Sequence, residues 1–226
     1  MTAFVLKVAG SLFVAAAAML WLGWTLLGVR PAGFFLPQQF AEIRADYRRW
    51  IWLYRVHIFG YLVTIMGAAA LAAALAAAVD GPDDRVLIWP GLTVLATGSL
   101  VGALGAAFYY HMGAWGALDL DGRGKDEISR FLGGLKVLTH YATCLVRFGR
   151  VFFGLGQVVL AAGLLHAGIL PGWVAVAAGL LGFAAIGVTM AKPDELERYR
   201  PVFHLNAAWM LVLGLVMLRA GIGADG

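Results

Sequence analysis

The chain has 226 residues, of which 62% are hydrophobic and only 13% are charged, and its formal net charge is +4. A soluble domain has about 45 to 50% apolar and about 25% charged residues, because polar groups must cover its surface. A mean hydropathy of +0.82 therefore excludes a soluble protein and predicts one that uses lipid as its solvent. No basic patch interleaved with aromatic residues points to nucleic acid as a partner.

Six segments are long and apolar enough to cross a hydrocarbon core of about 30 Å as helices. They are residues 8–29, 51–79, 86–112, 149–168, 172–191 and 201–219. The fourth and fifth belong to one uncharged run from Val151 to Ala191, which Pro171 and Gly172 divide into a helical hairpin. The first run is too long for a signal peptide and lacks a clear cleavage context, so we expect it to be retained. We predict an all-α polytopic membrane helix bundle that forms a single transmembrane domain over residues 1–226.

Basic residues are distributed unequally between the two sides of this predicted topology. Fourteen lie in the connections between spans one and two, three and four, and five and six: Arg30, Arg44, Arg48, Arg49, Arg55, Arg123, Lys125, Arg130, Lys136, Arg147, Arg150, Lys192, Arg198 and Arg200. Only Lys7, Arg85 and Arg219 lie on the other side. Because short cytoplasmic loops are enriched in Lys and Arg, we expect a bacterial-type inner membrane protein with both termini outside the cytoplasm.

Two of the basic connections are long enough to hold structure of their own. Residues 38–49 are predicted to form a short amphipathic helix with Phe40, Ile43 and Tyr47 on one face. The acidic stretch 119–127 resembles fragments of a calcium-binding loop, but it lacks the full ligand pattern and the closing Glu. We therefore expect a solvated turn there.

One polar stripe approaches and enters the fourth span at spacings of three and four residues, which place its members on one helical face. The stripe consists of Lys136, His140, Thr143, Arg147, Arg150, Gly154 and Gln157. One interpretation is an amphipathic approach helix that lies at the interface, with both arginines extended towards lipid headgroups. The other is a polar groove in which Arg147 and Arg150 bind an anionic headgroup or a cofactor carboxylate. Gln157 would then lie at the inner end of the groove and bond to Tyr61 or Thr64.

A matching stripe on the second span contains Trp50, Tyr54, His57, Tyr61 and Thr64. Trp50, Trp52 and Tyr54 are typical of the aromatic belt at a membrane surface, whereas the deeper Tyr61 and Thr64 are expected to face protein. The predicted spans contain no Asp or Glu. That composition argues against a proton relay or a di-iron site built on buried carboxylates.

Four histidines, His57, His111, His140 and His204, fall towards the predicted cytoplasmic side, and His166 falls on the other. A b-type haem needs two histidines from different helices at similar depth, and His57, His111 and His204 offer such a pair. His140 joins them as a candidate ligand for a metal ion. Histidine is also tolerated at membrane interfaces without any ligand. A single cysteine, Cys144, excludes a disulfide, a cysteine-ligated iron–sulfur cluster and c-type haem attachment.

Small residues mark where helix backbones are expected to approach one another closely. Gly98 and Gly102 form a GxxxG step that Gly105 extends, and spans four and five contain Gly154, Gly179, Gly182 and Gly187. We predict that these glycines form packing surfaces within the bundle or with a partner.

A Gly-rich run from Phe153 to Trp173 ends in a Leu-Pro-x-Trp turn, and Trp209 lies on the later helix. On these residues the last 75 positions resemble the C-terminal half of bacterial six-helix membrane protein families of unknown function. The resemblance implies a fold and no activity, and the first half of the chain departs from that pattern.

Three functions remain open from the sequence, and no catalytic residue is identified. The first is a non-catalytic subunit or hydrophobic-ligand binding protein of a larger membrane complex. The second is a haem- or metal-binding redox protein, and the third is a lipid or small-molecule transporter. Expected partners are the lipid bilayer and other membrane subunits or further copies of the chain, with no nucleic acid.

Overall fold

The computed structural model describes residues 2–27, 37–79, 81, 85–191 and 196–223. The elements within these ranges are α1 (Thr2–Leu27), α2 (Pro37–Ala45), α3 (Tyr47–Ala78), α4 (Ile88–Tyr109), η3 (Tyr110–Trp115), α5 (Gly116–Asp119), α6 (Lys125–Ala167), α7 (Gly172–Ala191), η4 (Leu196–Tyr199) and α8 (Arg200–Gly223). Six helical segments are long and apolar enough to cross a membrane. The predicted all-α bundle is confirmed, and the chain is a multi-pass integral membrane protein.

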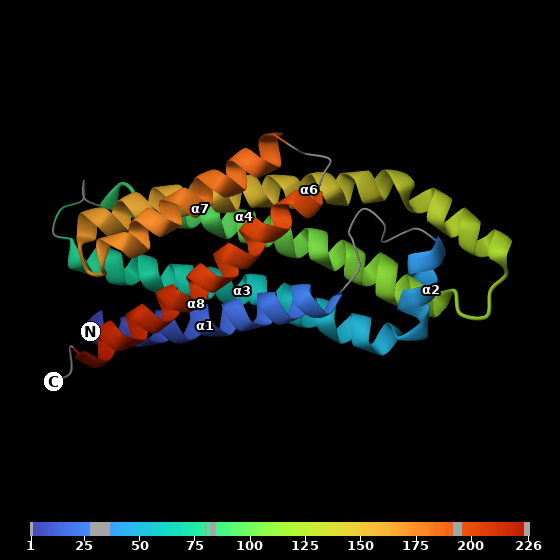
Figure 1. Ribbon diagram of the computed structural model, residues 1–226, viewed down its shortest axis with the longest axis horizontal. Coiled ribbons are helices and arrows are strands. Elements are labelled where there is room, and N and C mark those ends of the chain that lie inside the picture. Colours follow the sequence, from blue (N-terminus) through green and yellow to red (C-terminus); the bar gives the residue numbers. More distant parts are fainter. Residues whose placement is uncertain (1, 28–36, 80, 82–84, 192–195, 224–226) are drawn as a thin grey trace.

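The six spans follow one another around the bundle. α8 packs against α1, α1 against α3, α3 against α4, α4 against α6, and α6 against α7. α7 and α8 are neighbours in the chain but touch over a much smaller area, because α8 runs obliquely from the neighbourhood of α6 towards α1 (Figure 1). α1 begins and α8 ends at the same end of the molecule (Figure 1), as an even number of spans requires.

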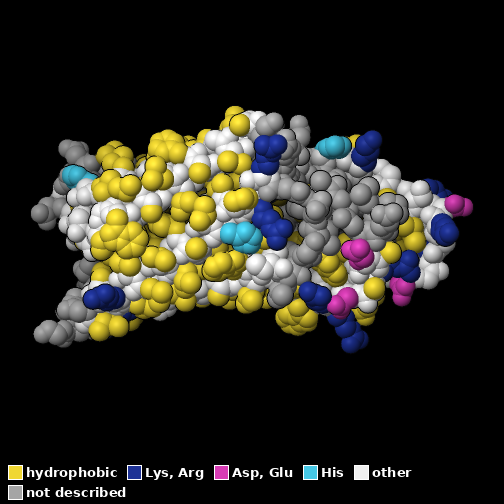
Figure 2. All heavy atoms as spheres, in the orientation of Figure 1, with side chains coloured by type: hydrophobic (Ala, Val, Ile, Leu, Met, Phe, Trp, Pro, Cys, Tyr) yellow, Lys and Arg dark blue, Asp and Glu magenta, His cyan; other side chains and the backbone are white. Residues whose placement is uncertain are grey.

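Figure 2 shows hydrophobic side chains over the half of the molecule that contains both of these helix ends, while most charged side chains gather at the opposite end. We call that opposite end, which carries the ion pairs Arg44–Asp121 and Arg123–Glu127, the basic end. Large apolar side chains such as Phe59, Leu100 and Phe183 are exposed on the spans. Side chains of this kind are stable on a surface only where lipid covers it.

α6 corrects the predicted fourth span, 149–168. It has 43 residues, which at 1.5 Å per residue make a helix of about 65 Å, about twice the hydrocarbon thickness. The approach segment is therefore not a separate helix, because it is the first half of α6 and runs without a break into the span. The inner face of this part of α6 packs into an apolar cluster in which Leu120, Tyr109 and Ala142 are buried.

Other helix boundaries also differ from the predicted ones. The third span, predicted to end at residue 112, continues through the π-helix η3 and α5 to Asp119. The expected helix over 38–49 is interrupted: α2 ends at Ala45 and α3 begins at Tyr47. Ile43 is fully buried as expected, whereas the side chain of Phe40, and all of Arg30 and Lys192, lie outside the described residues. The acidic stretch forms an exposed turn between α5 and α6, as predicted.

Glycines form the closest helix contacts. Any side chain at Gly98 would collide with the backbone of Phe153, and one at Gly154 would lie 2.6 Å from the carbonyl oxygen of Gly182. These contacts confirm the predicted packing role for Gly98, Gly154 and Gly182. Gly187 faces open space instead, so it does not pack within the bundle, and a packing role with a partner stays a prediction there.

Candidate functional site

A group of arginines and tyrosines lies inside the bundle where the spans approach the basic end. It comprises Tyr61 of α3, Tyr109 of α4, Arg147 and Arg150 of α6, and Tyr199 of η4, and we call it the arginine–tyrosine cluster. The Cζ atom of Arg150 lies 4.1 Å from the ring centroid of Tyr199. Arg150 also interacts electrostatically with Tyr61, Tyr109 and Arg147.

Local packing fixes the position of each member. Gly102 and Gly149 bring α4 and α6 together at the level of Tyr61, whose ring covers Gly102. The hydroxyl groups of Tyr109 and Thr143 lie 3.1 Å apart and form a hydrogen bond between α4 and α6. Tyr199 is buried immediately before the first turn of α8. Four elements thus converge on Arg150.

The cluster lies near one boundary of the hydrocarbon core. Arg150 precedes the end of α6 at Ala167 by 17 residues, or about 26 Å of helix, and Arg147 lies about 30 Å from that end. These distances place both guanidinium groups close to the membrane surface on the side of the basic end. A headgroup at that surface is within reach of them.

Electrostatically, the cluster is cationic. The ion pairs among the described residues join Arg44 to Asp121, Arg49 to Asp46, and Arg123 to Glu127. No described carboxylate pairs with Arg150. Burial raises the pKa of Tyr199 to about 12, so its phenol stays neutral although Arg150 favours ionisation.

At the basic end itself an ion pair joins Arg44 to Asp121. A hydrogen bond of 2.7 Å from Arg44 and the charge of the same guanidinium lower the pKa of the Asp121 carboxyl. This pair joins α2 to the turn that follows α5. The pair is exposed to solvent and connects these two segments at the basic end.

The predicted polar stripe on α6 divides into two parts. Lys136 and His140 are exposed on the part of α6 that projects beyond the membrane. Thr143, Arg147 and Arg150 are partly buried and face the neighbouring helices, with contacts from Thr143 to Tyr109 and from Arg150 to Tyr199. The inward position of Arg150 is the one that the groove interpretation requires.

Gln157 departs from its predicted bonding. Its side chain is 1% exposed, and neither amide atom has a hydrogen-bond partner among the described residues. The predicted bond to Tyr61 or Thr64 is wrong. The Thr64 hydroxyl instead donates to the carbonyl oxygen of Gly60, one turn earlier in α3, at 2.8 Å.

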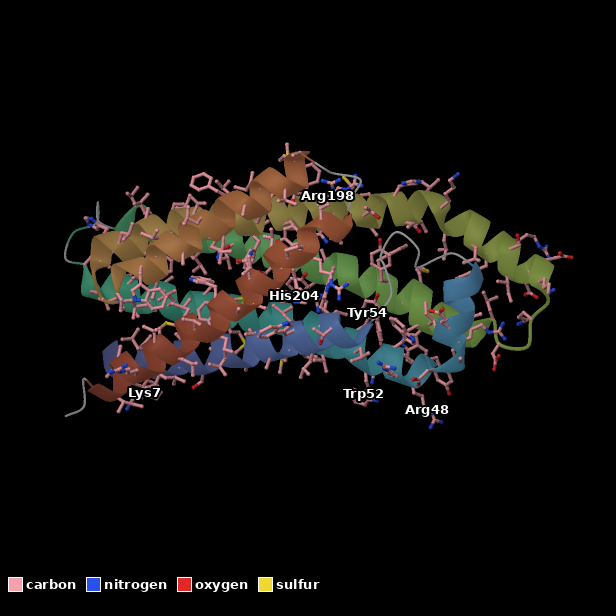
Figure 3. All side chains as sticks on the ribbon, viewed as in Figure 1. Lys7, Arg48, Trp52, Tyr54, Arg198 and His204 are labelled. Atoms are coloured by element: carbon pink, nitrogen blue, oxygen red, sulfur yellow. The ribbon has the colours of Figure 1, made fainter. Side chains whose placement is uncertain are left out.

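Of the candidate haem and metal histidines, His57 and His204 lie against the same aromatic ring, that of Phe203. His57 is buried on α3 against Gly23 of α1, and its ring contacts Trp24, Tyr61 and Phe203. His204 of α8 contacts the same Phe203, and Figure 3 shows it near the middle of the molecule, between Lys7 at one end and Arg48 towards the other.

His111 on η3, His140 and His166 are exposed. Within the ranges that the structure describes, no three His, Cys, Asp or Glu residues are grouped so as to hold a metal ion. A porphyrin between His57 and His204 would require the aromatic rings around His57 to move. The haem and metal sites stay predictions.

The stripe on α3 is more buried than expected. Trp50 and Tyr54 are buried at 8% exposed, so their assignment to an aromatic belt is wrong, while Trp52 is 63% exposed and fits it. Arg55 lies over the Trp52 ring, and its Nε donates to the Tyr110 hydroxyl at 2.9 Å. Tyr61 and Thr64 face protein, as predicted.

Tyr109 and Tyr199 were missed by the sequence analysis. Tyr109 lies close to the predicted end of span three, and Tyr199 lies between spans five and six. Tyrosine is common at such boundaries. No spacing in the sequence relates either residue to Arg150, because they reach it from other elements.

Compared with models of protein families, with curated proteins and with solved structures, the chain shows no significant match. The resemblance of its last 75 residues to six-helix membrane families therefore stays a prediction.

Proposed function

We propose that this membrane protein binds an anionic amphiphile, with the carboxylate or phosphate headgroup at Arg150 and Arg147. The observation that supports the proposal most directly is Arg150. Its guanidinium faces the protein interior over the Tyr199 ring and has no carboxylate partner among the described residues.

A cation held at the edge of the hydrocarbon core is costly unless a counter-charge reaches it. The guanidinium fork matches the geometry of a carboxylate or a phosphate group. The phenol of Tyr61 lies within electrostatic range of Arg150 and provides a hydroxyl donor for a further anion oxygen. The ligand chemistry that fits is a single negative headgroup on an apolar tail.

We place the basic end in the cytoplasm of a bacterial-type cell, since fourteen of the seventeen Lys and Arg residues belong to that side. The arginine–tyrosine cluster then faces the inner leaflet. In this orientation the protein takes its ligand from cytoplasmic-side lipid and acts as the hydrophobic-ligand binding member of a membrane assembly.

The test uses purified protein in phosphatidylcholine nanodiscs and radiolabelled probes that share one tail: stearate, stearyl phosphate and stearyl alcohol. We expect saturable binding of an anionic probe and none of the alcohol, and the two anions distinguish a carboxylate from a phosphate ligand. Arg150→Gln should weaken binding about 10- to 100-fold, because a hydrogen bond to a charged group contributes about 1.5 to 3 kcal/mol. Arg150→Lys should retain part of the affinity.

The matched control is Arg200→Gln, which removes an exposed positive charge near the same level and should leave binding unchanged. Equal binding of stearyl alcohol, or full binding by a folded Arg150→Gln variant, would refute the proposal. An absorption spectrum of the same preparation tests the haem alternative, which requires a Soret band.

A further inference from the structure

Arg55 of α3 is partly exposed and lies beside two aromatic rings at the surface of the bundle. Its guanidinium carbon is 4.9 Å from the centroid of the Trp52 ring and 5.8 Å from the centroid of the Tyr110 ring. Its Nε donates to the Tyr110 hydroxyl at 2.9 Å. These contacts join α3 to η3 and limit the orientations that the guanidinium group can adopt.

Two spans place these side chains at the level of lipid headgroups. Arg55 precedes the end of α3 at Ala78 by 23 residues, or about 35 Å of helix. Tyr110 follows Ile88, the first residue of α4, by 22 residues, or about 33 Å. The hydrocarbon core is about 30 Å thick, and each headgroup layer adds about 5 to 7 Å. The guanidinium and the phenol therefore lie beside the lipid phosphates of the leaflet at the basic end.

The surface around Arg55 is open to lipid and lacks an acidic partner. The Trp52 side chain is 63% exposed, and Figure 3 shows it projecting from the same side of α3 as Arg48, away from the other spans. In the described part of the chain no carboxylate pairs with Arg55. The charge of Arg55 is thus available to an anion from the bilayer.

Hydrogen-bond donors are also available to such an anion. Among the described residues Arg55 uses only its Nε–H, which leaves the N–H groups of both Nη atoms. The Tyr110 hydroxyl accepts the bond from Nε, so its own proton can be donated to an anion oxygen. Tyr110 begins the π-helix η3, and π-helical turns are frequent at functional sites.

An apolar strip continues from Arg55 into the hydrocarbon core. Phe59, Leu62 and Met66 follow Arg55 at spacings of four, three and four residues, which place them on one helical face. All three are exposed. A cation at headgroup level above an exposed apolar strip matches the head and tails of a membrane lipid.

We propose that Arg55, Trp52 and Tyr110 bind the phosphate group of an anionic phospholipid from the leaflet at the basic end. The lipid stays in the bilayer with its tails along the apolar strip, so the site needs no space inside the bundle. The guanidinium fork matches a phosphate group, and Trp is favoured at headgroup level. This site is separate from the arginine–tyrosine cluster and does not depend on the proposed function.

The experiment titrates purified full-length protein in detergent with phosphatidylglycerol or phosphatidylcholine of identical tails and counts the retained lipids by native mass spectrometry. We expect one phosphatidylglycerol to bind about tenfold more tightly than phosphatidylcholine, and Arg55→Gln to abolish this preference. Tyr110→Phe should weaken phosphatidylglycerol binding about threefold, since it removes one neutral donor. The matched control is Arg130→Gln, an exposed arginine of α6 beyond the membrane, which should change nothing.

Arg150→Gln distinguishes this site from the arginine–tyrosine cluster and should retain the preference. A preference that is lost in Arg150→Gln and retained in Arg55→Gln would assign the lipid to the cluster and overturn the inference. Displacement of the lipid by an excess of inorganic phosphate would also overturn it, because the site would then select a soluble anion. Equal binding of both lipids by the wild type would overturn the inference even if no variant folds, and stearate binding would still test the proposed function.

Discussion

Arg150 and Tyr199 come from different elements and meet with the guanidinium carbon 4.1 Å from the ring centroid. A guanidinium over an aromatic face is attracted by the quadrupole of the ring, and the attraction grows as water is removed. Tyr199 is 6% exposed, so little water reaches the contact and the attraction between the guanidinium and the ring is strong. It holds Arg150 in a fixed orientation over the ring.

We expect Tyr199→Phe to preserve the fold and the binding of anionic probes, because the aromatic face remains. Tyr199→Leu should destabilise the protein by about 1 to 2 kcal/mol, since the ring contact with Arg150 is lost. Thermal unfolding in detergent measures the stability, and the nanodisc assay measures binding. Equal loss in both variants would show that the hydroxyl group, rather than the ring face, is the important part of Tyr199.

Among the elements, α4 and α6 form the closest pair, and their contact depends on the absence of side chains. Gly98 lies directly against the backbone of Phe153, and Gly149 lies against Gly102 and the carbonyl oxygen of Gly98. In lipid, where apolar surface gains nothing by leaving the solvent, such close packing supplies much of the association energy. The same contact sets the distance from Tyr109 to Arg150.

Gly98→Ala should therefore destabilise the bundle by about 1 to 3 kcal/mol, the usual effect of overpacking a close contact. The matched control is Gly133→Ala on α6, where nothing lies within 4 Å of an added methyl group. That change should be neutral or stabilise the helix by about 0.5 to 1 kcal/mol. Thermal unfolding of both variants in one detergent checks the pair, and similar melting temperatures would contradict the packing we describe.

The whole molecule has two parts with different solvents. Six spans face lipid, and the extended ends of α3 and α6 form, with η3, α5 and α2, an apolar cluster of their own beyond the hydrocarbon core. Figure 2 shows the change from apolar to charged surface along the long axis. The arginine–tyrosine cluster lies where the two parts meet, which is where a ligand with a polar head and an apolar tail would be bound.

We expect reporter fusions to place the turn at residues 119–127 in the cytoplasm and the C-terminus at Gly226 on the opposite side, because the basic residues favour that orientation. Alkaline phosphatase is active only outside the cytoplasm and green fluorescent protein only inside it, so the two fusions give opposite signals at each site. A fluorescent fusion at Gly226 would reverse the orientation and move the cluster to the outer leaflet.

The sequence by itself determined the class of protein, the number of spans and the face of α6 that carries the arginines, because these follow from local composition and helical period. The tertiary structure alone decided what surrounds that face. Arg150 meets Tyr199 from an element about 50 residues away, and no local pattern encodes such a contact. The length of α6 was also missed, since its first half is stabilised by packing on α3 and α4 rather than by a hydrophobic run. The unsatisfied amide of Gln157 is also a result of the tertiary structure, because the Thr64 hydroxyl bonds within its own helix and not to Gln157.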